Sequence, residues 1–279
     1  MIGTVWAYIR LTHPWAVAVV MIATATFGLL AVDGEPEVGR FVLLLAGMLG
    51  GQVAIGASNE WHDREADALD KPHRPIPSGA VSPTGALAAT AAGLVMMTAA
   101  GAALGIRGLI LLAIGTGAGL TYNLWLKRTP LSWLPYLIAL PLLPTWVWLV
   151  MDEFNGALLW LYPLGATFVL AIHLAQTLPD IGADSRRGEQ GIGVVLGRRW
   201  SEIAIWVAAF GSTLGVGVGG WVTGDDWKPA VVAAGIVTLI LALALLFMRV
   251  ERHRLQPHLF KVLTSCAVIL ATGWILSAT

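Results

Sequence analysis

Residues 39–67 read GRFVLLLAGMLGGQVAIGASNEWHDREAD, an apolar run that leads directly into a charged segment. A helix needs about 20 mostly apolar residues to cross a bilayer. Residues 39–58 reach that length and carry a single charge, Arg40. Asn59, Asp63 and Asp67 then follow at intervals of four residues. This stretch predicts a membrane-spanning helix with a polar site at its end.

The rest of the chain has the same character. Hydrophobic residues make up 57% of the sequence and charged residues 12%, whereas an ordinary soluble domain has about 25% charged residues. We therefore expect an all-α, polytopic membrane protein, a bundle of nine transmembrane helices that forms a single domain over residues 1–279. The other eight predicted spans are 14–32, 82–105, 107–124, 131–150, 156–178, 201–223, 229–248 and 257–277.

The placement of the basic residues predicts the orientation of the bundle. If nine spans begin with a cytoplasmic N-terminus, nearly all Lys and Arg residues fall on the cytoplasmic side, as in most membrane proteins. The opposite side then carries only Arg40, Arg107 and Lys228. We expect the first helix to be retained, because its apolar run is too long for a cleaved signal. The net charge of zero gives no reason to expect a nucleic-acid partner.

Two connections are longer than the others, residues 59–81 and 179–200, and they hold much of the charge. In the first, the spacing of Asn59, Asp63 and Asp67 would place their side chains on one face if the helix continues through them. In the second, Asp180 and Asp184 repeat the four-residue spacing. The proline just before them, at position 179, is expected to interrupt the preceding helix.

Oxygen ligands of this kind favour Mg²⁺, which binds through a few carboxylates together with substrate phosphates. Basic residues that could contact phosphate oxygens are expected on the same side of the membrane; they are Arg64, Arg74, Lys127, Arg128, Arg186 and Arg187. Four neighbouring residues are interpreted as surface residues: Glu60, His62, Glu65 and Glu189. His173 either lines a cavity or is structural, while Tyr122 and Asn123 either anchor a helix end or belong to the site.

These segments, in this order, resemble the UbiA-type membrane prenyltransferases. The first motif is Asn59-xxx-Asp63-xxx-Asp67 followed by KPHRPIPSG at 71–79, and the second is Asp180-xxx-Asp184 with Gly188. The segment Tyr122-Asn123-x-x-Leu126-Lys127-Arg128 is similar to the one that follows the fourth helix of that family. Two positions depart from the pattern, since many members have Asp where Glu60 stands and a third acid near Arg187 and Gly188.

The resemblance implies an enzyme that transfers an isoprenoid chain from an allylic prenyl diphosphate to a lipophilic or aromatic acceptor. It implies that Mg²⁺ and pyrophosphate are held by Asn59, Asp63, Asp67, Asp180 and Asp184. It further implies that pyrophosphate is contacted by Arg64, Lys127 and Arg128, and that Tyr122 lies near the allylic carbon. The active site would open to the cytoplasmic side, and we expect the plasma (inner) membrane as the location.

Two other functions stay open at this point. A terpene cyclase on the same scaffold would ionise the same diphosphate and let an internal double bond capture the cation, and no sequence feature separates it from a transferase. A lipid or ion transporter would use the acidic residues as a cation relay. Transporters place ionisable groups near the bilayer midplane, whereas these acids lie at the ends of the predicted spans.

Overall fold

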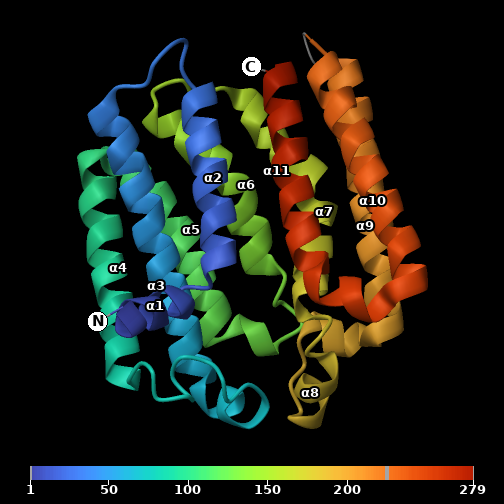
Figure 1. Ribbon diagram of the computed structural model, residues 1–279. Coiled ribbons are helices and arrows are strands. Elements are labelled where there is room, and N and C mark those ends of the chain that lie inside the picture. Colours follow the sequence, from blue (N-terminus) through green and yellow to red (C-terminus); the bar gives the residue numbers. More distant parts are fainter. Residues whose placement is uncertain (1, 224–225, 279) are drawn as a thin grey trace. The chain divides into compact units, whose positions relative to one another are not determined.

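The computed structural model describes residues 2–223 and 226–278, and within these ranges the regular structure is entirely helical (Figure 1). The chain divides into two compact units. The first comprises Met1–Lys127 and Leu142–Phe154, and the second comprises Arg128–Pro141 and Asn155–Thr279. That they act as one domain remains a prediction.

The first unit is built around α3, which is the central helix of its packing. Its elements are α1 (Ile2–Leu11), α2 (Pro14–Leu30), α3 (Val38–Asp70), α4 (Pro83–Ala103), α5 (Ile106–Leu124) and the end of α6 (Leu134–Val150). Helix α3 packs against α2, α4 and α5, which run beside it in Figure 1. A Cβ at Gly93 of α4 would lie 2.7 Å from the backbone of α3, so this glycine allows the two helices to approach closely.

The first two helices meet at a sharp break beside α3. The axes of Thr4–Leu11 and Pro14–Leu30 differ by 68°, and the break falls on His13, whose φ of 56° and ψ of 70° are left-handed. Pro14 then occupies the first turn of α2, where its missing N–H costs nothing. A Cβ at Gly56 would lie 2.7 Å from Cα of Thr12, so Gly56 lets the break pack directly on α3.

The second unit contains the remaining helices, α7 (Leu161–Thr177), α8 (Ile181–Arg186), α9 (Ile192–Thr223), α10 (Lys228–Leu255) and α11 (Leu259–Ala278). Helices α9, α10 and α11 pack against one another, and α7 packs against α9 and α11. The 3₁₀ turn Gly156–Trp160 precedes α7, and the indole of Trp274 donates to its Ala157 carbonyl at 3.1 Å. Helix α7 ends two residues before Pro179, as the proline predicts.

The prediction of membrane-spanning helices is confirmed in its coarser form. Each of the nine predicted ranges contains a helix. Among the described residues, six helices are long and apolar enough to cross a membrane, or seven if the bent pair of α1 and α2 forms one span. Helix α6 is apolar but has only 17 residues. The chain is therefore polytopic and all-α, and the count of nine remains a prediction.

Candidate functional site

The first acidic segment is the C-terminal continuation of α3. This helix is 33 residues long and runs from Val38 to Asp70 without interruption, so the condition for a shared face is met. Asp63 and Asp67 are both buried, with 8% of each residue exposed. Because a buried carboxylate needs a partner of opposite charge or a set of hydrogen-bond donors, these two acids require compensation within the first unit.

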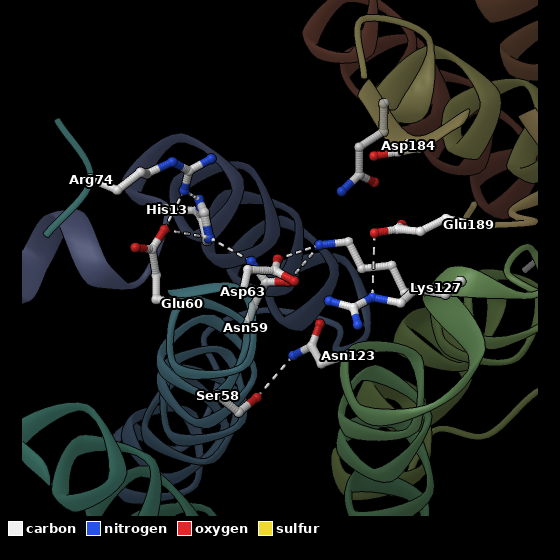
Figure 2. A network of polar contacts seen from close by, with 12 residues as sticks. His13, Ser58, Asn59, Glu60, Asp63, Arg74, Asn123, Lys127, Asp184 and Glu189 are labelled. Atoms are coloured by element: carbon white, nitrogen blue, oxygen red, sulfur yellow. Dashed lines mark hydrogen bonds and ion pairs between the residues drawn. The ribbon is translucent and has the colours of Figure 1, made fainter. Parts of the chain in front are cut away.

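Lys127 provides that compensation at Asp63. It lies in the short 3₁₀ turn Leu126–Arg128 after α5, and its ammonium forms an ion pair with the Asp63 carboxylate. The same ammonium donates to Oδ1 of Asn59 at 3.4 Å. Figure 2 shows the amide and the carboxylate directed at the lysine nitrogen. The sequence predicted that these three residues belong to one site, and the structure brings them together.

The oxygen atoms that contact Lys127 are of the kind that could bind a metal ion. Two oxygens from successive turns of one helix converge on a single cation, the lysine ammonium, which stands in for a cationic ligand. Amide and carboxylate oxygens are the donors that Mg²⁺ prefers. Within the described residues, no group of three or more His, Cys, Asp and Glu side chains is placed to hold a metal ion. A metal ion at this position would therefore need the Asn59 oxygen and phosphate oxygens of a ligand in addition to the carboxylate. The donors present fit a metal ion bound in this way.

Glu60 is not a surface residue, and its predicted place was wrong. It is 1% exposed, and its Oε1 is paired with Arg74 and lies 3.5 Å from Nε2 of His13. Its Oε2 is buried without a hydrogen-bond partner. The helical period explains the burial, because Glu60 follows Asn59 by one residue and faces about 100° away from it. Ala57, one turn earlier on that face, belongs to a buried cluster with Leu11 and with Ile76 of the connection after α3.

His13 joins this ion pair to the oxygen-bearing face of α3. Its Nε2 lies 3.3 Å from Nδ2 of Asn59, and its Nδ1 lies 3.3 Å from Nη1 of Arg74 (Figure 2). Burial, together with the positive charges of Arg74 and Lys127, lowers the pKa of His13 to about 4. The ring is therefore neutral at pH 7. Sequence reasoning did not place it beside Asn59, since 46 residues separate the two.

The end of α5 positions the lysine from the other side. Nδ2 of Asn123 donates to the Ile55 carbonyl and to Oγ of Ser58, both at 2.8 Å. Asn123 is 3% exposed and Tyr122 is 6% exposed. Asn123 thus fastens α5 to α3 four residues before Lys127. Tyr122 lies buried beside it, and its predicted place near the allylic carbon stays a prediction.

Arg64 turns along the helix surface. Its Nη1 donates to the Trp61 carbonyl at 2.7 Å and its Nη2 to Glu65 at 3.0 Å. The guanidinium also lies 4.7 Å from the centre of the Trp61 ring. These are local contacts within two turns of α3. The predicted contact of Arg64 with a diphosphate would require this side chain to exchange them.

The second acidic segment belongs to a polar cluster within the second unit. Asp180 precedes α8 and Asp184 lies on it. Arg187 donates through Nη2 to Asp184 at 2.5 Å and through Nε to Glu189 at 3.1 Å. Nε of Arg128 lies 3.5 Å from Glu189. Glu189, whose side chain is 13% exposed, is thus an acceptor for two arginines rather than a surface residue.

His173 also lies in the second unit, and it is fully buried. Its Nε2 lies 2.9 Å from Oγ of Ser132, and its ring packs 4.9 Å from the ring of Tyr136. The Ser132 hydroxyl in turn accepts from the backbone N–H of Ile192 at 3.3 Å. These contacts join three segments of the unit and favour the structural interpretation of this histidine.

Comparison with known proteins places this fold and these segments in one family. The model of the UbiA prenyltransferase family matches residues 18–269. The digeranylgeranylglyceryl phosphate synthase of Halobacterium salinarum is 32% identical over 197 residues, which are 67% of this chain and 68% of that protein. The protoheme IX farnesyltransferase of Acidiphilium cryptum is 37% identical over 115 residues, 39% of this chain and 35% of that protein.

Solved structures show the same fold. A UbiA homolog from Aeropyrum pernix K1 superposes with a TM-score of 0.72 at 23% identity and covers 94% of this chain and 97% of its own. A UbiA homolog from Archaeoglobus fulgidus bound to DMAPP and Mg²⁺ superposes with a TM-score of 0.73 at 15% identity, covering 96% and 99%. Since the family model spans nearly the whole sequence, the chain belongs to the UbiA prenyltransferase family.

Proposed function

We propose that this protein is a Mg²⁺-dependent prenyltransferase that moves an isoprenoid chain from an allylic prenyl diphosphate to a lipophilic or aromatic acceptor and releases pyrophosphate. The observation that carries the proposal is the convergence of Asn59 and Asp63 on the Lys127 ammonium. A site that binds a cation through oxygens and also contains a partly exposed basic side chain is suited to a metal–diphosphate ligand.

The oxygen donors of α3 would hold the metal. Asn59 and Asp63 supply two oxygens on one face, and Asp67 supplies a third on the next turn of the same helix. When bound, Mg²⁺ would neutralise charge that develops on the departing diphosphate. Because Lys127 is already directed at this position, its ammonium could pair with the diphosphate once the metal takes its place at Asp63.

The reaction follows from the polarity of the allylic C–O bond. That bond breaks with both electrons going to oxygen, so pyrophosphate leaves and an allylic cation remains. The acceptor nucleophile forms the new bond to this carbon and loses a proton. Lys127 and Arg128, and Arg64 if it releases Glu65, would stabilise the leaving group by donating to its oxygens. Tyr122 offers an aromatic face to the cation, and the apolar helices exclude water that would capture it.

We extend the site to Asp180 and Asp184 on sequence grounds, since these residues of the second acidic segment repeat the four-residue spacing seen in α3. The second segment offers fewer acids, and Asp184 is paired with Arg187. We therefore assign the larger share of metal binding to α3.

The proposal includes the membrane arrangement. We infer nine spans with a cytoplasmic N-terminus in the plasma (inner) membrane, with the prenyl tail in the bilayer and the diphosphate at the cytoplasmic surface. The distribution of Lys and Arg supports this orientation. Transfer is favoured over cyclisation because two relatives are named digeranylgeranylglyceryl phosphate synthase and protoheme IX farnesyltransferase.

Turnover of purified protein with prenyl diphosphates and a panel of acceptors tests the function. Asp63→Asn and Asp67→Asn should abolish turnover while the protein still folds, and EDTA should do so reversibly. Asp180→Asn and Asp184→Asn should reduce turnover less. Full activity in metal-free protein would refute the metal-dependent scheme, and a cyclic hydrocarbon formed without an acceptor would refute transfer.

A further inference from the structure

His13 is held in a left-handed backbone conformation, which is uncommon for a non-glycine residue. Its φ of 56° is one of two positive values among the described non-glycine residues. A left-handed conformation is sterically unfavourable for a non-glycine residue, and glycine would adopt it without that penalty. The sequence nevertheless places an imidazole at the break between α1 and α2. A strained residue at such a place calls for a function of its side chain.

The ring faces two donors that a neutral imidazole cannot both satisfy. One ring nitrogen of a neutral histidine accepts and the other donates. The Arg74 guanidinium can only donate, so a hydrogen bond from it to Nδ1 requires the ring proton on Nε2. The Asn59 Nδ2 is also only a donor, and a hydrogen bond from it to Nε2 requires the proton on Nδ1. Each tautomer can therefore accept a hydrogen bond from only one of the two donors. The Nε2–H form accepts from Arg74, and the Nδ1–H form accepts from Asn59.

The amide of Asn59 links the tautomer of His13 to the binding of a metal ion. Its Nδ2 faces His13 and its Oδ1 faces Lys127. A metal would bind the oxygen, and the amide nitrogen would then be fixed on the His13 side. We propose that His13 is a positioning residue for Asn59, whose ring accepts the amide N–H when a metal binds and holds the oxygen toward Asp63.

Arg74 and Glu60 make this positioning reversible. Without a metal, Nδ1 accepts from Arg74, and the Nε2–H faces Oε1 of Glu60 at 3.5 Å. With a metal, Nε2 accepts from Asn59 and the proton lies on Nδ1, so Arg74 keeps Glu60 as its partner. The Nε2 proton leaves to water and Nδ1 takes a proton from water, which reaches the ring because the His13 side chain is 34% exposed, so the net charge does not change. Gly56, which lets the break pack on α3, keeps the ring within reach of Asn59.

The inference rests on the proposed metal–diphosphate function, and His13→Gly tests it. Glycine keeps the left-handed backbone and removes the ring, so the unfolding temperature should not fall. The dissociation constant for Mn²⁺ with inorganic pyrophosphate, measured by electron paramagnetic resonance, should rise about 10- to 100-fold, as for other residues that orient metal ligands. The KM for Mg²⁺ should rise in the same proportion, with kcat recovered at saturating Mg²⁺. His258→Gln, an exposed histidine of the second unit, should change neither quantity.

The tautomer itself is a second readout that does not depend on a variant's folding. The chain has 6 histidines, and ¹³C,¹⁵N-histidine labelling with His13→Gly as the reference assigns the His13 signals. Addition of Mg²⁺ and inorganic pyrophosphate should move the ring from the Nε2–H to the Nδ1–H form. An unchanged tautomer, or wild-type affinity in His13→Gly, would overturn the role of His13. Failure of the wild type to bind Mn²⁺–pyrophosphate in an Asp63-dependent way would instead overturn the proposed function.

Discussion

The Lys127 ammonium is ion-paired with the Asp63 carboxylate, which lies 64 residues earlier in the chain. The side chain of Asp63 is 11% exposed and that of Lys127 is 30% exposed, so the pair is partly withdrawn from water. The lysine neutralises the acid at the position where a metal would bind. Metal alone must compete with this ammonium, whereas a metal–diphosphate ligand gives the ammonium a new partner.

Replacement of Lys127 by Met should therefore separate two binding events. Free Mn²⁺ should bind at least about tenfold more tightly, a gain of about 1.4 kcal/mol, because no internal cation occupies Asp63. Mn²⁺–pyrophosphate binding and turnover should both fall. Electron paramagnetic resonance titration measures the two affinities. Lys228→Met, at an exposed position in α10, is the matched control, and equal affinity of both variants for free Mn²⁺ would contradict the competition.

Glu60→Ala should destabilise the first unit. It leaves the Arg74 guanidinium, 26% exposed, without its buried counter-ion, and breaking such a pair costs about 3–5 kcal/mol when the remaining charge stays buried. We expect a loss of about 2–4 kcal/mol, since Arg74 can reach water. Thermal unfolding in detergent measures it. Glu65→Ala removes a carboxylate that is 84% exposed and should change stability by less than about 0.5 kcal/mol.

Asn123→Ala should loosen the connection between α5 and α3. It removes hydrogen bonds to the Ile55 carbonyl and to Ser58, each 2.8 Å long. Each is worth about 1 kcal/mol, with a further penalty for the buried acceptors, so the unfolding free energy should fall by about 2–3 kcal/mol. Ser58→Ala leaves the bond from Asn123 to the Ile55 carbonyl in place, but it also removes the bond that Oγ of Ser58 donates to that carbonyl at 2.9 Å. A double-mutant cycle of the two variants measures the coupling between the side chains, and a coupling of zero would contradict their hydrogen bond.

Gly93→Ala should separate α4 from α3. The added Cβ would lie 2.7 Å from the Ala54 nitrogen and from the Gly50 oxygen, and such overpacking costs about 1–3 kcal/mol. Gly117→Ala on α5 is the matched control, because nothing lies within 4 Å of its Cβ. That variant should be as stable as the wild type or more so, given the better helix propensity of alanine. Equal unfolding temperatures for both variants would exclude the close approach.

Local patterns predicted the parts of the site that depend on local geometry. The four-residue spacing of Asn59, Asp63 and Asp67 could be converted into a shared helix face because helical geometry is fixed. The apolar runs likewise predicted where helices form. They did not establish how many of those helices span a membrane, since length and hydropathy leave α6 and the bent pair of α1 and α2 undecided.

Contacts between distant segments could not be predicted in the same way. Glu60 reads as one more charge in a charged segment, yet Arg74 and His13 reach it from two other parts of the chain. The positive φ of His13 has no sequence signal, since the proline that follows it favours an extended conformation at His13 and marks a helix start. The charges in the sequence do not reveal which acidic side chain is paired with a basic side chain of the same protein.

The uninterrupted length of α3 has a consequence for the entropy of ligand capture. A helix of 33 residues is about 50 Å long at 1.5 Å per residue, roughly 20 Å more than the hydrocarbon core of a bilayer. Its last turns can therefore extend past the acyl chains while keeping the rigidity of the buried part. Asn59, Asp63 and Asp67 are ordered when the protein folds, so a diphosphate arriving from water meets donors whose backbone freedom has already been lost.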